Sequence, residues 1–310
     1  MNLIVCYTPL QLMIASKIIN LTNEKYEVFV LTESGTSKDK VDYYLKRMKK
    51  KSNIHYFNLG KNRISNIFRL SLYIKRVFKK KFDAIFLASI DNSYYHYLLS
   101  RLCYDRIFTF DDGIANIIEN GPYESKKDSL VLNLFRFFLF VRVTLEYIKE
   151  NSSLHYTIYK DKNIFAKTYY IRLFDEIGGG EVIDVNRKVK IFLGQPIYEH
   201  DAEKSKEINQ RVVMKLEDCK YYPHPRDSFF LTDVDVIESQ LIFEEYLLVA
   251  LKENRDTEFE IYSFFSTVLV NLRSVERVKL YSVDVNDAYF SKYYNKIKAM
   301  GVDIIDIESL

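Results

Sequence analysis

The chain has 310 residues, of which 48% are hydrophobic and 28% are charged, and its formal net charge is only +3. This balance is typical of a folded protein and excludes an intrinsically disordered one; the length predicts two domains, because a domain usually holds about 100–200 residues. The three cysteines lie far apart, at Cys6, Cys103 and Cys219, which argues against a disulfide framework or a zinc site and is typical of a reducing cytoplasm.

The amino-terminal stretch "MNLIVCYTPLQL" has no basic region and no cleavage-site pattern, so we expect a buried first strand rather than a secretory signal. Short runs rich in β-branched and aromatic residues then alternate with helical stretches. The expected strands are residues 2–7, 26–33, 54–59, 84–89 and 106–112, and the expected helices are residues 11–21, 37–50, 64–79 and 93–102. Strands that are continuously apolar and alternate with helices predict a parallel, doubly wound sheet.

The longest apolar stretch is Ser129–Ile148, which Arg136, Arg142 and Glu146 interrupt. Its uninterrupted parts are far shorter than the ~20 residues that span a bilayer, so we expect no transmembrane helix here. We expect a helical segment at residues 129–150 instead, which either lies near a membrane surface or packs against a partner subunit.

The second half of the chain repeats the alternation of strands and helices. The expected strands are residues 188–194, 219–225, 259–264, 277–283 and 302–307, and the expected helices are residues 204–215, 241–251, 266–272 and 288–300. A join is expected near Gly178–Gly180, which holds three of the nine glycines. We therefore predict an α/β fold of two Rossmann-like domains facing each other across a cleft, with an N-terminal domain at 1–180 and a C-terminal domain at 181–310.

Five turns that are polar or marked by Gly and Pro follow expected strands, which is where open parallel sheets bind ligands. They are "CYTPLQ", "FTFDDGIANI", "FLGQPIYEHD", "YYPHPRD" and "YSFFSTVL", and all five prolines lie within or near them. In one turn His224 stands between Pro223 and Pro225. Because proline fixes φ and lacks an N–H group, this histidine cannot sit inside a helix or a central strand. The pattern indicates either a rigidly held imidazole at a site or an ordinary tight turn.

Two basic runs, Leu45–Lys51 and Lys75–Lys81, hold ten cations. No nucleic-acid-binding motif accompanies them, so we expect no nucleic-acid partner. The runs are either solvated helix ends or segments that an anionic membrane surface attracts.

The motifs "FDDG", "PHP" and "SFFST", in this order, resemble the acidic-Gly, His-Pro and Ser-Ser/Thr motifs of bacterial sialyltransferases. Together with "YTPLQL" and "LGQP", they make the chain similar to glycosyltransferase family 52 over essentially its whole length. The resemblance implies a GT-B-like fold and CMP-N-acetylneuraminate as the donor, bound by the C-terminal domain without a further cofactor. It also implies an inverting, metal-independent α-2,3-sialyl transfer to a terminal galactoside of lipooligosaccharide.

The resemblance also implies roles for residues of the second half. His224, followed by Pro225, would protonate or neutralise the departing phosphate, since imidazole titrates near neutrality. Gly194 and Gln195 would lie near the cytidine or its phosphate. The hydroxyl residues expected at the phosphate are Ser263, Ser266 and Thr267, although Ser266 would equally serve as a plain helix N-cap.

Two positions are candidates for the general base that takes the proton of the acceptor hydroxyl. Asp201 lies 23 residues before His224, where its position resembles the base of family 52, and it is the favoured candidate. The Asp111–Asp112 pair would shape the acceptor or sialyl pocket, or be the base itself. The alternative for both positions is helix capping, with a helix at residues 114–118 after the pair. The remaining candidate binding residues are Gly113, Thr8 and Pro9.

The sequence leaves two alternative functions open. A related glycosyltransferase could use another CMP-sugar or a UDP-hexose, and a non-catalytic, membrane-associated binding protein could keep the same frame. The triple glycine at residues 178–180 lacks the Lys-Ser/Thr of a P-loop, and no G-x-G-x-x-G occurs, so no dinucleotide cofactor is expected. His200 beside Asp201 lacks the further ligands of a metal site. The family analogy favours a cytoplasmic protein, peripheral on the inner membrane, and a homodimer.

Overall fold

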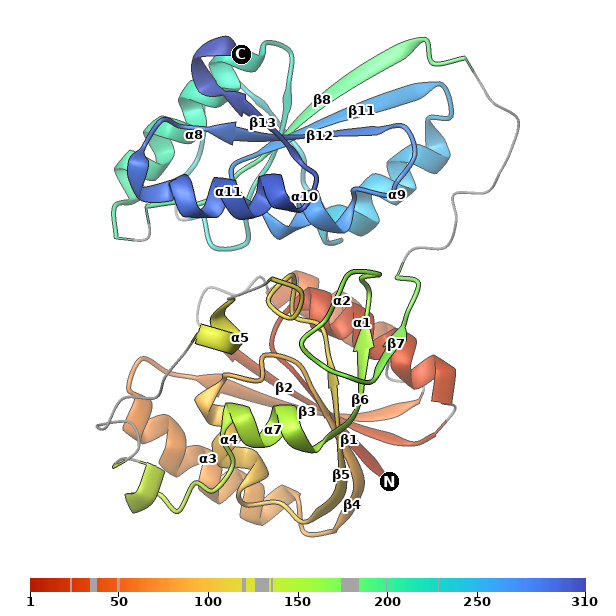
Figure 1. Ribbon diagram of the computed structural model, residues 1–310, viewed down its shortest axis with the longest axis vertical. Helices are drawn as coiled ribbons and strands as arrows, with labels where there is room; N and C mark the ends of the chain where they lie inside the picture. Colours follow the sequence, from red (N-terminus) through yellow and green to blue (C-terminus); the bar gives the residue numbers. More distant parts are fainter. Residues whose placement is uncertain are drawn as a thin grey trace. The chain divides into compact units, whose positions relative to one another are not determined.

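The computed structural model describes residues 1–22, 24–33, 38–48, 51–118, 121–125, 134, 136–173, 184–198, 200–227 and 229–310. Contacts within the chain divide it into two compact units, Met1–Leu173 and Phe174–Leu310, and each is a parallel sheet with helices packed against it (Figure 1). The expected join at Gly178–Gly180 lies outside the described residues, so the domain boundary at residue 180 stays a prediction.

The first unit is built on a seven-stranded parallel sheet with the order β3-β2-β1-β4-β5-β6-β7. Its strands are β1 (Asn2–Cys6), β2 (Tyr26–Glu33), β3 (Ser52–Leu59), β4 (Phe82–Leu87), β5 (Tyr104–Phe110), β6 (Ser152–Thr157) and β7 (Thr168–Tyr170). Its helices are α1 (Pro9–Thr22), α2 (Lys38–Met48), α3 (Arg63–Val77), α4 (Ser93–Leu99), α5 (Pro122–Ser125) and α7 (Leu145–Asn151). Strand β1 pairs with β2 on one side and β4 on the other, and all five of its residues are buried. The strand order therefore reverses beside β1.

The second unit is built on a six-stranded parallel sheet with the order β10-β9-β8-β11-β12-β13. Its strands are β8 (Arg187–Leu193), β9 (Lys220–Tyr222), β10 (Asp235–Val236), β11 (Thr257–Ser263), β12 (Val278–Asp284) and β13 (Asp303–Asp306). Its helices are α8 (Ala202–Leu216), α9 (Phe243–Glu253), α10 (Thr267–Asn271) and α11 (Ser291–Ala299), with short 3₁₀ turns η1 (Ala288–Phe290) and η2 (Ile307–Ser309). Here the order reverses beside β8, which pairs with β9 and β11.

The predicted strands and most of the predicted helices are confirmed, with ends that differ by a few residues. Five elements were not expected: α5, β6, β7, β10 and the 3₁₀ turn η2. Strand β6 carries polar residues that contact polar groups inside the unit, and β7 and β10 are only three and two residues long.

Two helix predictions were wrong in the described residues. Residues 114–118 form turns, with an Ile117 N–H bond to the Ile114 carbonyl. Between residues 129 and 150, residues 141–144 are not helical and α7 begins at Leu145, so the described part of this stretch is not one helix. Phe140 has a φ of +48°, which a continuous helix does not allow. None of the described helices combines the length and the apolar character that crossing a bilayer requires.

Candidate active site

The turns after β8, β9 and β11 lie at one edge of the second sheet. In the parallel register Leu193 of β8 pairs with Tyr222 of β9, and Phe192 of β8 pairs with Tyr262 of β11. The turns that begin at Gly194, Pro223 and Phe264 therefore start side by side. This is also the point where the strand order reverses, and open parallel sheets bind ligands at such points. The sequence predicted this grouping of the "LGQP", "PHP" and "SFFST" motifs.

The half-buried His224 is held by three hydrogen bonds within its own turn. Its backbone N–H donates to Asp227 Oδ2 (2.7 Å), and the Asp227 N–H donates to the His224 carbonyl (2.9 Å). The N–H of Arg226 donates to Nδ1 of the imidazole (3.1 Å). Because Nδ1 accepts a hydrogen bond, the neutral ring carries its proton on Nε2. The turn therefore selects one tautomer, with an N–H donor at Nε2.

Asp227 was not among the residues expected at the site. Its Oδ2 also accepts a hydrogen bond from the hydroxyl of Tyr221 (2.8 Å), while its Oδ1 is buried and has no hydrogen-bond partner among the described residues. Burial raises the pKa of Asp227, and the bonds from Tyr221 and from the His224 N–H oppose this shift. Burial, and then the nearby Asp227 carboxylate, raise the pKa of Tyr221, which keeps the phenol protonated as a donor.

Gly194 is needed here for the packing of Tyr221. A Cβ atom at this position would lie 2.2 Å from the hydroxyl oxygen of Tyr221 and 2.7 Å from its Cζ. The absence of a side chain therefore makes room for the Tyr221 ring. The placement of Gly194 near the cytidine or its phosphate stays a prediction.

Gln195 connects two of the turns through its side chain. Its Oε1 accepts hydrogen bonds from the Phe265 N–H (3.0 Å) and from the Ser263 hydroxyl (3.3 Å). Its backbone N–H and carbonyl both bond to the side-chain amide of Asn209 on α8, at 3.2 and 2.9 Å. Gln195 thereby holds the β8 turn against β11 and α8.

The hydroxyl residues after β11 have local hydrogen-bond partners. Ser263 is fully buried and donates to the Leu193 carbonyl (2.9 Å), so it is not exposed to a ligand in this structure. Ser266 is the N-cap of α10, where its Oγ accepts from the Val268 N–H (3.3 Å), and Thr267 is the first residue of that helix. Ser266 and Thr267 are both half-buried at the edge that carries His224.

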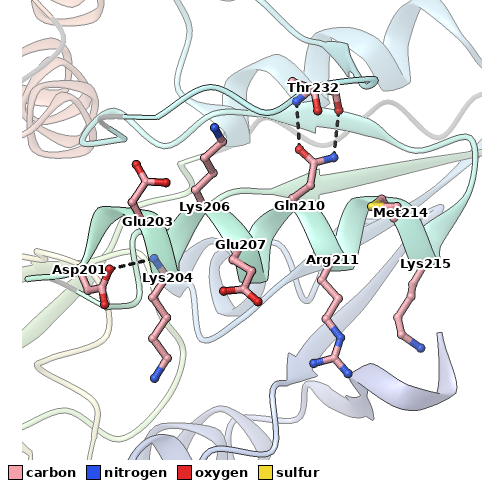
Figure 2. Close-up of a pocket in the computed structure, with 10 residues that line it drawn as sticks. All are labelled: Asp201, Glu203, Lys204, Lys206, Glu207, Gln210, Arg211, Met214, Lys215 and Thr232. Carbon is pink, nitrogen blue, oxygen red and sulfur yellow. Dashed lines mark hydrogen bonds between the residues drawn. The ribbon is translucent and has the colours of Figure 1, made fainter.

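Asp201 is exposed and caps α8, with Oδ1 accepting a hydrogen bond from the Lys204 N–H (2.9 Å) (Figure 2). It lies at one end of a groove along the outer face of α8 that charged side chains line. Within the groove, Gln210 makes two 3.0 Å hydrogen bonds to the backbone of Thr232. The groove is formed by α8 and Thr232 rather than by the strand-end turns. The capping alternative for Asp201 is thus present, and it occupies one of the two carboxylate oxygens.

In the first unit, Asp112 lies at the edge where β1 and β4 are neighbours. Gln11 Nε2 donates to Ser89 Oγ (2.9 Å), and the Ser89 hydroxyl donates to Asp112 Oδ2. Burial raises the pKa of Asp112, which the bonds from Ser89 and Gln11 partly oppose. Gln11 Oε1 also accepts a hydrogen bond from the Tyr7 N–H (2.6 Å). The backbone N–H of Gln11 donates a hydrogen bond to Thr8 Oγ1 (3.3 Å).

Pro9 is the first residue of α1, where its fixed φ suits a helix start. Ser89 and Gln11 were not predicted as site residues. Only their positions could have indicated them, because Ser89 lies just after β4 and Gln11 lies in the first turn of α1, which follows β1.

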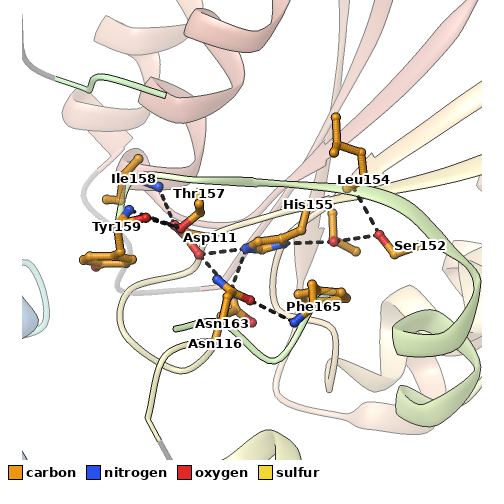
Figure 3. Close-up of polar contacts among 11 residues, drawn as sticks. Asp111, Asn116, Ser152, Leu154, His155, Thr157, Ile158, Tyr159, Asn163 and Phe165 are labelled. Atoms are coloured by element: carbon orange, nitrogen blue, oxygen red, sulfur yellow. Dashed lines mark hydrogen bonds and ion pairs between the residues drawn. The ribbon is translucent and has the colours of Figure 1, made fainter. Parts of the chain in front are cut away.

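Asp111 is fully buried, and both of its carboxylate oxygens are occupied (Figure 3). Oδ1 accepts hydrogen bonds from His155 Nε2 (2.9 Å) and Asn116 Nδ2 (3.0 Å), and Oδ2 accepts from the Thr157 hydroxyl (2.8 Å) and the Ile158 N–H (2.6 Å). A substrate cannot reach this carboxylate without displacing these partners. We therefore reassign Asp111 from the candidate catalytic residues to those that hold the turn.

The neighbouring residues complete this arrangement. The His155 ring stacks on Phe165, with centroids 4.3 Å apart, and its Nδ1 bonds to the Thr109 hydroxyl (2.9 Å). Gly113 has a φ of +68°, a conformation that glycine adopts without steric cost. In the described part of the chain, no group of three or more His, Cys, Asp or Glu side chains is placed to hold a metal ion.

Two solved structures of glycosyltransferases share this architecture. SnogD from Streptomyces nogalater superposes with a TM-score of 0.53 at 11% identity, covering 100% of this chain and 88% of that chain. A 2,6-sialyltransferase from Photobacterium sp. JT-ISH-224, solved with CMP and lactose, superposes with a TM-score of 0.51 at 12% identity, covering 99% and 78%. The two Rossmann-like units thus have the GT-B fold of glycosyltransferases.

The profile of glycosyltransferase family 52 matches residues 25–287, and the chain belongs to this family. A CMP-N-acetylneuraminate:beta-galactoside alpha-2,3-sialyltransferase of Pasteurella multocida (strain Pm70) is 31% identical over 99% of both chains. An N-acetyllactosaminide alpha-2,3-sialyltransferase of Neisseria meningitidis (strain Z2491) is 29% identical over 99% of this chain and 86% of its own. Another enzyme of that name, from Haemophilus influenzae (strain Rd), is 28% identical over 98% and 99%.

The two neighbouring aspartates should differ in their effect on stability. We expect Asp111→Ala to lower the free energy of unfolding by about 3 kcal/mol or more, because it removes the buried carboxylate that accepts hydrogen bonds from four donors. Asp112→Ala should cost clearly less, since this half-buried carboxylate has fewer partners. Thermal and urea unfolding of both variants measure the difference, and equal losses would contradict the distinct placement of the two side chains.

Proposed function

We propose that the chain is an inverting, metal-independent sialyltransferase. It transfers N-acetylneuraminate from CMP-N-acetylneuraminate to a terminal galactoside of lipooligosaccharide, in α-2,3 linkage. The names of its relatives support the donor, the galactoside and the linkage. The observation that carries the proposal is the imidazole of His224, held as a single tautomer at the reversal point of the second sheet.

His224 acts on the leaving group. As the sugar–phosphate bond breaks, negative charge develops on the phosphate of CMP, and a fixed donor aimed at that charge lowers the barrier. The Nε2–H of His224 supplies this donor. Ser266 and Thr267 stay predicted phosphate-binding residues at the same edge, and their hydroxyl groups would share the phosphate with the imidazole.

Asp201 takes the proton from the acceptor hydroxyl in this proposal. It follows β8 in the same unit as His224. Its capping hydrogen bond uses Oδ1, and none of the hydrogen bonds described for this side chain uses Oδ2. Asp112 is the alternative base, because burial raises its pKa towards the range in which a carboxylate accepts a proton efficiently. With Ser89 and Gln11 it otherwise shapes the acceptor or sialyl pocket.

Replacing His224 tests the proposed chemistry directly. We expect His224→Ala to keep the thermal stability of the protein and to lose about 100-fold or more of kcat for sialyl transfer, since general acid–base assistance contributes about 10²–10⁴-fold. Transfer to lactose and slow hydrolysis of CMP-N-acetylneuraminate are the measurements. Turnover of a UDP-hexose or of another CMP-sugar instead would keep the family and overturn the donor.

Asparagine substitutions separate the two candidate bases. Asn caps a helix about as well as Asp, so Asp201→Asn should leave α8 stable while it removes the basic carboxylate. We expect this variant to lose most of kcat at saturating donor, and Asp112→Asn to lose less. Asp201→Ala serves as a control, because it also removes the cap. A larger loss in Asp112→Asn would move the base to the first unit.

We also propose that the protein lies peripherally on the cytoplasmic face of the inner membrane, where a glycolipid acceptor is found. Helix α3 supports this contact: Ile64, Phe68 and Leu72, spaced by four residues on one helical face, are 71%, 66% and 54% exposed. The segment Lys61–Lys81 around them holds eight Lys and Arg and no Asp or Glu. An exposed apolar stripe within a purely basic segment is typical of a helix that lies on an anionic membrane.

Vesicle binding tests the α3 stripe, which we define as Ile64, Phe68 and Leu72. Substituting the three residues by Ser should abolish sedimentation with vesicles that contain phosphatidylglycerol, whereas Met214→Ser, at an equally exposed site on α8 (72%), should not change it. Binding should weaken as salt rises, because each cation near the surface adds about 1 kcal/mol. Unchanged vesicle binding with loss of a dimer in ultracentrifugation would assign the stripe to a homodimer interface instead.

A further inference from the structure

The two prolines beside His224 do not by themselves fix the direction of its imidazole. Each proline fixes its own φ and restricts the residue before it to extended backbone. The torsion angles of His224 retain freedom within that region, and so does the ring. Hydrogen bonds from outside the Pro-His-Pro triplet must therefore select one conformation.

The Asp227 carboxylate supplies the stronger of these bonds. Its Oδ2 lies 2.7 Å from the backbone nitrogen of His224, and a hydrogen bond to an ionised acceptor is about twice as strong as a neutral one. The return bond from the Asp227 N–H to the His224 carbonyl (2.9 Å) closes the turn. With the turn closed, the Arg226 N–H meets Nδ1 and selects the tautomer.

Asp227 is in turn held by a side chain of the strand. The Tyr221 hydroxyl donates to the same oxygen, Oδ2 (2.8 Å), and its ring is buried in β9 with 2% exposure. The ring fits because residue 194 of the neighbouring strand end is glycine. A continuous series of contacts thus runs from Gly194 through Tyr221 and Asp227 to His224.

We propose that Tyr221 and Asp227 are positioning residues for His224, and that Gly194 serves the reaction by admitting the Tyr221 ring. This inference rests on the proposed role of His224 at the leaving phosphate. Misplacing a reacting group by about 1 Å can cost about 100-fold in rate. Loss of these contacts should therefore lower kcat, although none of the three residues need touch the substrate.

Single substitutions on β9 provide a matched test. Tyr221→Phe removes only the hydroxyl that holds Asp227. Tyr222→Phe removes the neighbouring buried hydroxyl, which bonds to the Leu241 carbonyl (2.5 Å) and does not lead to the His-Pro turn. We expect a fall in kcat of about 10-fold or more for Tyr221→Phe and Asp227→Asn, with KM for the donor changed less than about threefold, and a change below about twofold for Tyr222→Phe.

A double-mutant cycle separates positioning from a general loss of structure. In a His224→Ala background, Tyr221→Phe should cause no further loss of kcat, because the imidazole that it positions is already absent. Gly194→Ala should show the same dependence on His224. Gly60→Ala is its control, because a Cβ there has no neighbour closer than 3.5 Å. If Asp227→Asn does not fold, the Tyr221 and Gly194 variants still test whether these residues position His224.

Each result has a distinct meaning. Near-wild-type transfer by His224→Ala would overturn the proposed function of the imidazole itself. A large loss in His224→Ala with normal rates in Tyr221→Phe and Asp227→Asn would overturn the positioning inference alone. Losses that multiply in the double variants would also overturn it, since they would show that Tyr221 acts independently of His224.

Discussion

Parallel pairing of β8 with β9 on one side and β11 on the other is the constraint on which the candidate site depends. The carboxyl ends of the three strands must meet at one edge, so motifs about 30 and 70 residues apart in the sequence become neighbours. Gln195 then joins the first turn to the third by hydrogen bonds, and the packing of the Tyr221 ring against Gly194 joins the first turn to the second. A polar site at a sheet edge needs such contacts between its turns, because turns that lack them are the least ordered part of a fold.

In the first unit, a buried carboxylate orders the turn at the sheet edge. Asp111 stabilises the turn after β5 through four donors, three of which come from residues 155–158 at the end of β6. The next residue, Asp112, is only half-buried and keeps a carboxylate at the edge beside Ser89. Adjacent identical residues therefore have different environments, since alternate side chains leave the backbone on opposite sides. The acidic-Gly motif thus combines one residue that holds the turn with one that stays near the edge.

The sequence predicted the fold well because its central strands hold continuous apolar runs, such as Leu3–Cys6 in β1 and Ala84–Leu87 in β4. Strand β6 was missed because Ser152, His155 and Thr157 look like a polar loop, although two of them are buried against Asp111 or Thr109. The positions of the site motifs could be predicted from strand ends and prolines. Their contacts could not, because the Tyr221–Gly194 and Gln195–Phe265 pairs depend on which strands are neighbours, and strand order is not encoded in local patterns.

Glycine and proline have complementary functions at this edge. Pro223 and Pro225 reduce the conformations open to His224 in every state of the chain, whereas Gly194 acts only in the folded sheet, where it leaves space for a neighbouring ring. A glycine whose motif suggests a ligand contact can therefore be needed for the packing of another side chain, which the sequence pattern alone does not identify. Asp201 and Ser266, which were also predicted as site residues, cap the helices that follow β8 and β11. Capping and chemistry do not exclude each other, because a carboxylate or hydroxyl oxygen that caps a helix retains other lone pairs.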